Sequence, residues 1–490
     1  MRYLKHLSLL LLLSIYVECA TPTLPQSNHE SATAMLYERS FETKEPNIAM
    51  LNLFFTQMPK GGDLHHHYSG SLYAETYLEW VKNKNWLIDT CSFKIVKTKS
   101  NASCKQISVD ELIANDTLYR QLLTLWSDKD FNNHSHDQLP PDSNFFNTFI
   151  YFSPISDQYM DIGLNLIKER ALSENVSYIE SMLARVGVNS TEFFNAEEVT
   201  KLNNELRNTT SQEEVNALLE RISTVFSNAQ AFNEKINNFV KELEQKHQGI
   251  DNESFTMRYQ TYAVRVLNPL QVYTDLFSGY LAALNSPVIV GVNIVAPENN
   301  TVAINDYTLH MRMFHYLANK YPKVHRSLHA GELTLGMVEP KELLFHITQA
   351  RDIGRAERIG HGVDLPYEKE SLRVLEDLKH HAAIEINLTS NQFILGVTGN
   401  AHPYPIYAAY GVPLVISTDD SGVSRNNLTH EYILLASRYH PSYMTLKTYV
   451  YNSIDYSFLS PEDKIKVRAQ LDKKFMVFER EMSALAKHLK

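Results

Sequence analysis

Side chains that could bind a metal ion gather at four places in the sequence. The first is the run Asp63-Leu-His-His-His67, in which His65 and His67 share one face of a β-strand while His66 faces the other way. The other three segments are Ser327-Leu-His-Ala-Gly-Glu332, Arg358-Ile-Gly-His361 and Ser417-Thr-Asp-Asp420. Neutral imidazole is the commonest protein ligand of transition metals, and histidine with aspartate suits Zn²⁺.

The four segments together predict one mononuclear zinc-type site that keeps a position open for water. Each segment alone has an ordinary explanation, because a single histidine is usually structural and Asp419-Asp420 could simply cap a helix. Glu332 follows His329 by three residues, which places a proton donor or acceptor beside a metal-bound water. The segment Val292–Ile294 contains no lysine that could carry a bridging group, which makes a dinuclear hydrolase less expected.

These segments need a scaffold that brings them together. Short apolar runs alternate with longer helical stretches such as Tyr307–Lys320 and Lys341–Ile353, which favours a (β/α)₈ barrel. A doubly wound sheet is the alternative, but the motifs fall at strand ends, as a barrel requires. The eight expected strands are Asp63–His67, Tyr178–Arg185, Phe255–Arg265, Pro287–Ala296, His325–Glu332, Arg358–Asp364, Ala383–Asn387 and Pro413–Thr418.

The chain has 490 residues, and several of its segments are additional to the strands and helices of a minimal barrel. We expect a signal peptide at 1–20, an N-terminal extension at 21–55, and a barrel at 56–490 with insertions at about 85–140 and 188–250. In the second insertion an amphipathic helix is predicted to pack on the barrel or on a partner subunit. Its apolar stripe consists of Val215, Leu218, Leu219, Ile222, Val225 and Phe226.

Composition limits the partners and the compartment. The formal net charge is −10 with no cluster of basic residues, which argues against binding along a nucleic acid. A signal peptide predicts a secreted or periplasmic protein, with no membrane attachment after cleavage. Export would leave Cys91 and Cys104, which we expect to form a disulfide. Two unrelated thiols are the alternative.

On these motifs the sequence resembles the adenosine deaminase family of metal-dependent amidohydrolases. The match runs from about residue 55 to 440, and the start Met58-Pro-Lys-Gly-Gly-Asp-Leu-His-His-His67 resembles the secreted, growth-factor-like branch and its bacterial relatives. The resemblance implies an aminohydrolase that holds one Zn²⁺ per subunit. Such an enzyme converts adenosine, and 2′-deoxyadenosine, to the corresponding inosine and ammonia. For the secreted branch it also implies a homodimer.

The resemblance also assigns roles. It implies that Glu332 protonates N1 of the purine, and that His361 orients the metal-bound hydroxide and takes part in proton transfer. Asp420 would hydrogen-bond N7, and the backbone at Ala296 would meet N3. Phe145, Phe146 and Phe149 resemble an apolar gate, although such a triplet is more often plain core. The implied metal ligands are His65, His67, His329 and Asp419.

Three positions depart from the family pattern. Ser69 stands where classical members carry an acid that contacts the ribose 5′-hydroxyl, Ala296 replaces a glycine, and Asn293 replaces a common aspartate. Ser69 therefore keeps deamination of another aminopurine open as an alternative. A secreted binding or signalling protein of the same fold is a second alternative, which Glu332 beside a complete metal set disfavours.

Overall fold

An eight-stranded parallel sheet forms the centre of the molecule. The computed structural model describes residues 28–101, 103–129 and 139–489. The strands follow one another around the sheet in the order β1-β5-β6-β7-β8-β9-β10-β11, so each of the eight predicted strands is present. They are β1 (Gly61–His67), β5 (Val176–Ala184), β6 (Thr256–Val264), β7 (Ile289–Val295), β8 (His325–Ala330), β9 (Arg358–His361), β10 (Ala383–Ile386) and β11 (Leu414–Ile416).

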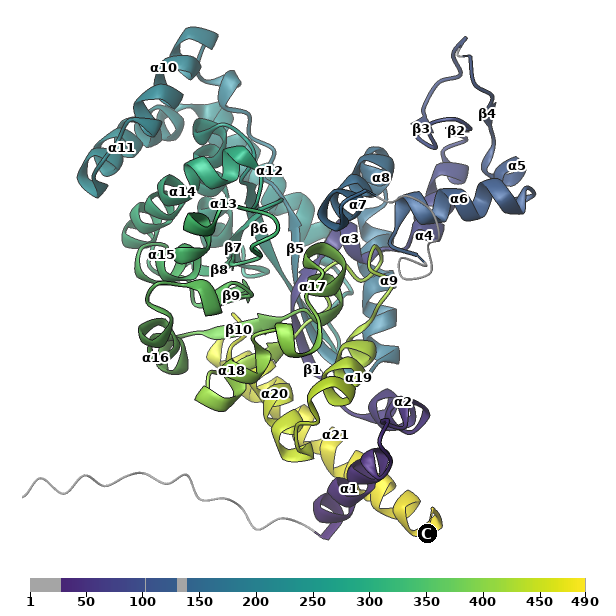
Figure 1. Ribbon diagram of the computed structural model, residues 1–490. Helices are drawn as coiled ribbons and strands as arrows, with labels where there is room; N and C mark the ends of the chain where they lie inside the picture. The colour runs from purple at the N-terminus through teal and green to yellow at the C-terminus, as the bar shows by residue number, and fades with distance from the viewer. Residues whose placement is uncertain (1–27, 102, 130–138, 490) are drawn as a thin grey trace, which may run out of the picture.

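The sheet closes where its first strand meets the segment after its last. His66 and Asp419 form a parallel bridge. Across it, Asp419 N–H donates to the carbonyl of His65 over 2.8 Å, and His67 N–H donates to the carbonyl of Asp419 over 3.3 Å. The sheet is therefore a (β/α)₈ barrel, and its carboxyl-terminal mouth receives the ends of all eight strands (Figure 1).

Helices cover the outside of the barrel because its strands carry runs of apolar side chains that must be buried on both faces. Polar caps fix where several begin: the Asn268 and Asn300 side chains accept from Gln271 N–H and Val302 N–H at the starts of α13 and α14. The surrounding helices are α4 (Ala74–Asn83), α9 (Met160–Ser173), α13 (Pro269–Asn285), α14 (Thr301–Lys320), α15 (His346–Asp352), α16 (Ser371–His381), α18 (Tyr404–Tyr410), α19 (Leu428–Tyr439) and α20 (Tyr443–Asp455).

One predicted helix is interrupted. The expected helix over Lys341–Ile353 consists of a 3₁₀ turn, Pro340–Leu344, followed by α15. Between them Phe345 has φ −155° and ψ −2°, outside the helical region, so the two segments cannot form one continuous helix.

Three helices fill the second insertion: α10 (Ala196–Arg207), α11 (Gln212–Asn228) and α12 (Gln230–His247) (Figure 1). The predicted amphipathic helix is α11, and it packs on α14 of the barrel and on the neighbouring α12, so its apolar stripe is covered within the same chain. Five of the six stripe residues are buried. Val225 is the exception, with 43% of its surface exposed, because it lies beside the stripe at the edge of the contact.

The first insertion forms a small separate sheet at the edge of the barrel (Figure 1). Its antiparallel strands are β2 (Leu87–Asp89), β3 (Ile95–Val96) and β4 (Gln106–Ile107), followed by α5 (Val109–Ile113) and α6 (Asp116–Trp126). A disulfide joins Cys91 to Cys104 within it, as the sequence predicts. Four shorter helices lie nearer the mouth: α3 (Tyr68–Ser71), α7 (Pro141–Asn147), α8 (Phe149–Ser156) and α17 (Leu388–Leu395).

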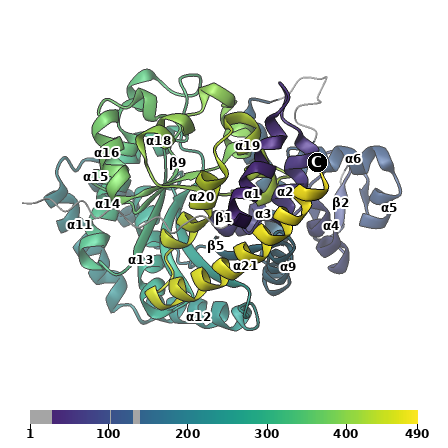
Figure 2. The same cartoon turned by 90° about the horizontal axis from the view of Figure 1, so that it is seen from below.

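The two ends of the described chain lie together. Helix α1 (Asn28–Glu38) packs along α21 (Pro461–His488), and α2 (Ile48–Gln57) packs on α19 (Figure 2). The predicted signal peptide at 1–20 lies outside the described residues. Among residues that the structure describes, no helix combines the length and apolar character needed to cross a lipid bilayer.

Candidate active site

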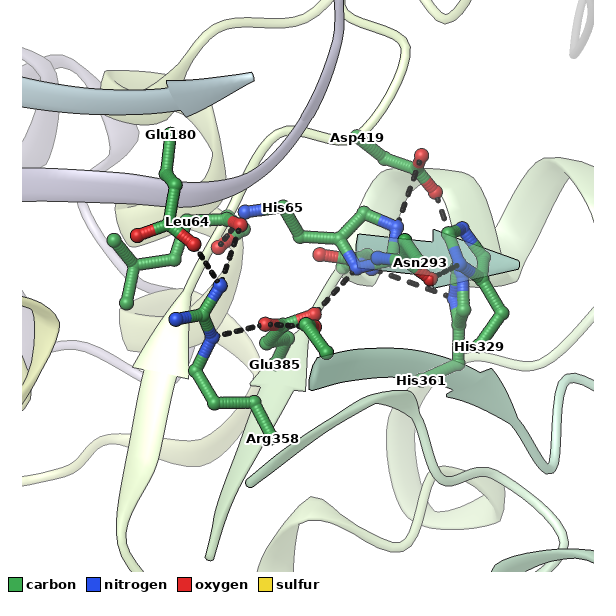
Figure 3. Close-up of polar contacts among 12 residues, drawn as sticks. Leu64, His65, Glu180, Asn293, His329, Arg358, His361, Glu385 and Asp419 are labelled. Carbon is green, nitrogen blue, oxygen red and sulfur yellow. Dashed lines mark hydrogen bonds and ion pairs between the residues drawn. The ribbon is translucent and has the colours of Figure 1, made fainter. Parts of the chain in front are cut away.

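The predicted metal ligands converge at the mouth of the barrel. His65 and His67 come from β1, His329 from the end of β8, and Asp419 from the loop after β11 (Figure 3). The Nε2 atoms of His67 and His329 lie 3.2 Å apart. Oδ1 of Asp419 lies 3.4 Å from Nε2 of His65 and 3.3 Å from Nε2 of His67. Residues far apart in the sequence thus form two overlapping groups, His65–His67–Asp419 and His65–His329–His361, within each of which the donor atoms lie within 4.8 Å of one another.

These distances suit a zinc ion. Ligand atoms at about 2.0–2.1 Å from a tetrahedral Zn²⁺ are about 3.3 Å from one another, close to the separations seen here. His65 Nε2 is also buried without any hydrogen-bond partner, an arrangement that costs free energy unless a cation completes it. Burial lowers the pKa of His65, but the neighbouring carboxylates of Asp419 and Glu385 raise it to about 10. The site therefore favours positive charge, and its residues fit the metal.

A carboxylate outside the cluster orients His65. Nδ1 of His65 donates to Oε2 of Glu385 over 2.7 Å (Figure 3), which leaves the Nε2 lone pair on the side of Asp419. Glu385 is held in turn by Nε of Arg358 at 2.6 Å, and Nη2 of Arg358 also contacts Glu180. Burial would raise the pKa of Glu385, but Arg358 and His65 lower it to about 2, so this carboxylate is ionised.

An amide chain orients His329. Nδ1 of His329 donates to Oδ1 of Asn293 over 2.9 Å, and the Ile294 N–H donates to the same oxygen. Asn293 Nδ2 donates to Gln260, whose own amide donates to Glu180 over 2.8 Å. Because a carboxylate only accepts, this chain has one direction and leaves the Nε2 lone pair of His329 free. Asn293, which stands where the family pattern has an aspartate, thus orients His329.

Glu332 and His361 face the cluster formed by His65, His67, His329 and Asp419. Nε2 of His361 lies 3.6 Å from Oε1 of Glu332 and 3.6 Å from Oδ2 of Asp419. Burial and the nearby charge of Asp419 raise the pKa of Glu332 well above its usual range, which favours a protonated side chain. Glu298 fixes the backbone here by accepting from Gly331 N–H over 3.1 Å and from Glu332 N–H over 3.0 Å. The arrangement therefore offers a proton donor beside the metal-binding residues.

The cluster forms one wall of a cavity of about 440 Å³. Ser69, Ala296 and Asp420 line it, together with Glu332 and His361, as the sequence predicts. The three phenylalanines of the expected gate also line it, from α7 and α8. The lining residues that the sequence analysis did not single out are Ser153, Tyr262, Val264, Val295, Pro297 and Ile394.

Two backbone features place the predicted purine contacts. Ala296 has φ +84°, a region that favours glycine, which explains why a glycine is usual at this position. An added Cβ on Gly70 would lie 1.5 Å from Oδ1 of Asp420. Only a residue without a side chain leaves room there for the Asp420 carboxylate.

Sequence reasoning missed the buried residues that support the cluster. Glu385 lies in the middle of the apolar strand Ala383–Ile386, and a charged residue in such a strand is a signal that could have been used. Glu180 and Glu298 are equally buried. His66 lies opposite the cluster, where its Nδ1 contacts Ser181 Oγ at 3.0 Å, as strand alternation predicts.

Comparisons with known proteins identify the family of the chain. The sequence model of the family described as "Adenosine deaminase" matches residues 226–474, slightly more than half of the chain. The adenosine deaminase of Enterococcus faecalis is 32% identical over 152 residues, which is 31% of this chain and 42% of that protein. That of Clostridium kluyveri is 33% identical over 148 residues, 30% of this chain and 39% of that protein. The chain thus aligns with about two fifths of these relatives' length.

Solved structures show the same fold at low identity. An N6-mAMP deaminase from arabidopsis has a TM-score of 0.56 and 18% identity, covering 86% of this chain and 99% of that one. A zinc-bound amidohydrolase from Burkholderia ambifaria has a TM-score of 0.52 and 15% identity, covering 88% and 94%. Adenine deaminase from Arthrobacter aurescens has a TM-score of 0.50 and 16% identity, covering 85% and 98%. These likenesses concern the fold, and the match of the family model to more than half of the sequence shows that the chain belongs to the adenosine deaminase family.

Proposed function

We propose that the protein is a zinc-dependent aminohydrolase that converts adenosine, and 2′-deoxyadenosine, to the corresponding inosine and ammonia. The observation that carries this proposal is the position of Glu332. Its side chain is buried beside three histidines and an aspartate, at the inner end of a cavity large enough for a nucleoside. A binding protein would have no need of a proton donor at that place.

Each residue of the candidate site has its own role in the proposed reaction. His65, His67, His329 and Asp419 would hold Zn²⁺, which when bound lowers the pKa of water to about 7 and so supplies a nucleophile near neutral pH. Glu332, kept protonated by burial, donates to N1 as the attack at C6 breaks ring aromaticity. Asp420, whose pKa burial and Asp419 raise, can donate a hydrogen bond to N7. Ala296 presents backbone to N3.

The lining of the cavity favours a nucleoside over a nucleotide. Phosphates are usually held by arginine, lysine or helix N-termini. None of the described residues that line the cavity is a lysine or an arginine. Among the structural neighbours from arabidopsis, one is named an N6-mAMP deaminase and others are complexed with GMP or IMP, so these proteins are associated with phosphorylated purines. We therefore place adenosine before AMP as the substrate.

Another aminopurine is the second candidate, because Ser69 offers a neutral hydroxyl to the cavity where a carboxylate would fix the sugar. We also propose that the protein is secreted or periplasmic, in line with the growth-factor-like branch. The Cys91–Cys104 disulfide supports that location, because disulfides persist mainly in oxidising compartments. A homodimer is proposed on the same resemblance.

The test is ammonia release by the purified mature chain. Adenosine, 2′-deoxyadenosine, adenine and AMP are compared, with Glu332→Gln and a metal-stripped sample as controls. We expect turnover of the two nucleosides, a loss on the order of 10²-fold or more in Glu332→Gln with zinc content unchanged, and recovery of the stripped sample on adding Zn²⁺. Absence of turnover on all four compounds by the zinc-loaded protein would refute the proposal in favour of a binding role.

A further inference from the structure

His361 occupies an ambiguous position. A nitrogen of its ring lies within 4.8 Å of ring nitrogens of both His65 and His329, so distance alone would admit it as a fourth imidazole ligand. A neutral imidazole binds a metal through the nitrogen that lacks a proton and donates through the other. The role of His361 therefore depends on which nitrogen carries the proton.

The backbone N–H of Tyr404 determines which nitrogen of His361 carries the proton, through the side chains of His402 and Asn391. Tyr404 N–H, in the first turn of α18, donates to Nδ1 of His402 over 3.0 Å. N–H groups in the first turn of a helix have no acceptor within the helix, and a backbone N–H can only donate. Nδ1 of His402 must therefore be the unprotonated nitrogen. His402 is buried, and this burial and the charge of Arg438 lower its pKa to about 3, so the ring is neutral.

The proton of His402 then lies on Nε2 and fixes the next side chain. Nε2 of His402 lies 2.9 Å from Oδ1 of Asn391 and donates to it. This contact orients the amide, so that Nδ2 of Asn391 donates to Nδ1 of His361 over 2.8 Å. The amide of Asn387 approaches the same Nδ1 at 3.4 Å. Nδ1 of His361 is therefore an acceptor, and its proton lies on Nε2.

This polarity is opposite to that of the ligand histidines. His65 and His329 both donate from Nδ1, to Glu385 and to Asn293, and so direct a lone pair at the metal position. We infer that Asn391 and His402 are positioning residues that hold His361 as the Nε2–H tautomer. This tautomer keeps His361 out of the ligand set and makes it a hydrogen-bond donor to the attacking oxygen, a role that rests on the proposed function.

A chemical consequence follows for proton transfer. In this tautomer Nε2 has no lone pair, so His361 cannot remove a proton from water at that atom. The ring points the N–H at the space beside Asp419 Oδ2 and Glu332 Oε1, both 3.6 Å away. Asp419 is then the acceptor of the water's proton, and His361 holds the oxygen in place. Asp419 and His361 therefore act on the same oxygen atom of the attacking water: His361 donates a hydrogen bond to it, and Asp419 accepts its proton.

The direct test is nitrogen NMR of the side chains in protein labelled with ¹⁵N-histidine. The signals of His361 are assigned by their loss in His361→Gln. We expect a protonated Nε2 and an unprotonated Nδ1 for His361 in wild type, with and without Zn²⁺. A protonated Nδ1 in the wild type would overturn the inference whatever the enzyme's activity, because the measurement does not depend on turnover.

Variants separate the positioning role from a structural one. Asn391→Asp keeps the size of the side chain but offers only acceptors, so we expect the proton of His361 to move to Nδ1. His402→Gln keeps a donor for Asn391 and should preserve the wild-type tautomer, whereas His402→Phe should not. Asn203→Asp is the matched control, because Asn203 Oδ1 accepts from Leu270 N–H far from the cavity. Unchanged His361 signals in both Asn391→Asp and His402→Phe would overturn the inference.

Activity provides a second readout. For Asn391→Asp we expect kcat to fall about 10- to 100-fold, the usual effect of outer-sphere changes, with KM altered less and zinc content retained. If wild type deaminates no aminopurine, the proposed function fails while the NMR result still decides the tautomer. If wild type is active and the tautomer is Nδ1–H, only the present inference fails.

Discussion

His65 and Glu385 lie 320 positions apart in the sequence, and the imidazole Nδ1–H of the first donates to the carboxylate of the second over 2.7 Å. Glu385 also accepts a hydrogen bond from Nε of Arg358, so it both orients His65 and compensates the charge of a buried guanidinium. We predict that Glu385→Gln lowers zinc affinity about 10- to 100-fold, because the neutral amide orients and polarises His65 less strongly. Competition with a chromogenic chelator measures this affinity.

The control for that change is Glu376→Gln, a substitution of the same kind at an exposed carboxylate that pairs with His380. It should leave zinc affinity unchanged. Equal affinity in Glu385→Gln and wild type would show that His65 needs no carboxylate to bind the metal.

Two glycines should separate metal binding from purine binding. A Cβ on Gly360 would lie 2.5 Å from Cε1 of His65, whereas one on Gly70 would collide with Asp420. Gly360→Ala should therefore reduce zinc content, and Gly70→Ala should retain zinc but lower kcat/KM for adenosine at least tenfold, because a weakened N7 contact costs more than 1 kcal/mol. Metal analysis and steady-state kinetics on both variants decide this. The same defect in both would mean that the two effects are not separable.

Acid should remove the contribution of Glu298 to stability. Burial would raise its pKa, but Arg265 and His346 lower it from the ordinary 4.5 to about 2. A carboxylate with a lowered pKa in the folded state stabilises the protein above about pH 4.5, and this contribution is lost between pH 4.5 and 2. The free energy of unfolding of Glu298→Gln should be lower than that of wild type by on the order of 3 kcal/mol at pH 6. Urea unfolding from pH 3 to 7 should show the difference shrinking toward low pH. A difference that does not vary with pH would contradict this assignment.

The Cys91–Cys104 disulfide should matter for its own small sheet and not for chemistry. It closes a loop with a sequence separation of 13 residues, and neither cysteine lines the cavity. Replacing both cysteines with serine should speed hydrogen exchange in β2–β4, since the open loop has more unfolded conformations to sample, and leave kcat unchanged. Exchange measured by mass spectrometry checks the first expectation. A large fall in kcat would reveal contact between this sheet and the site.

The sequence was sufficient to predict the barrel and the convergence of its motifs. Strand alternation placed His65 and His67 on one side and His66 on the other, and the structure agrees because a two-residue period leaves no other choice. The outer hydrogen bonds could not be predicted. Asn391 and His402 act through contacts across the fold, and nothing local distinguishes them from other buried polar residues. For Glu385 the one local signal is its charge within the apolar strand Ala383–Ile386. The interruption at Phe345 likewise depends on a backbone angle that apolar periodicity does not encode.

The seam between β1 and the loop after β11 has a consequence for biosynthesis. His65 and His67 lie on one side of it and Asp419 on the other, joined by hydrogen bonds between their backbones. A ribosome must therefore deliver nearly the whole chain before the four donors can meet. If the protein binds zinc as proposed, an ion held by His65, His67 and Asp419 would link the first strand of the barrel to the loop after the last. A chain that ended before residue 419 would contain His65, His67 and His329, but it would have neither Asp419 nor the backbone contacts that close the barrel.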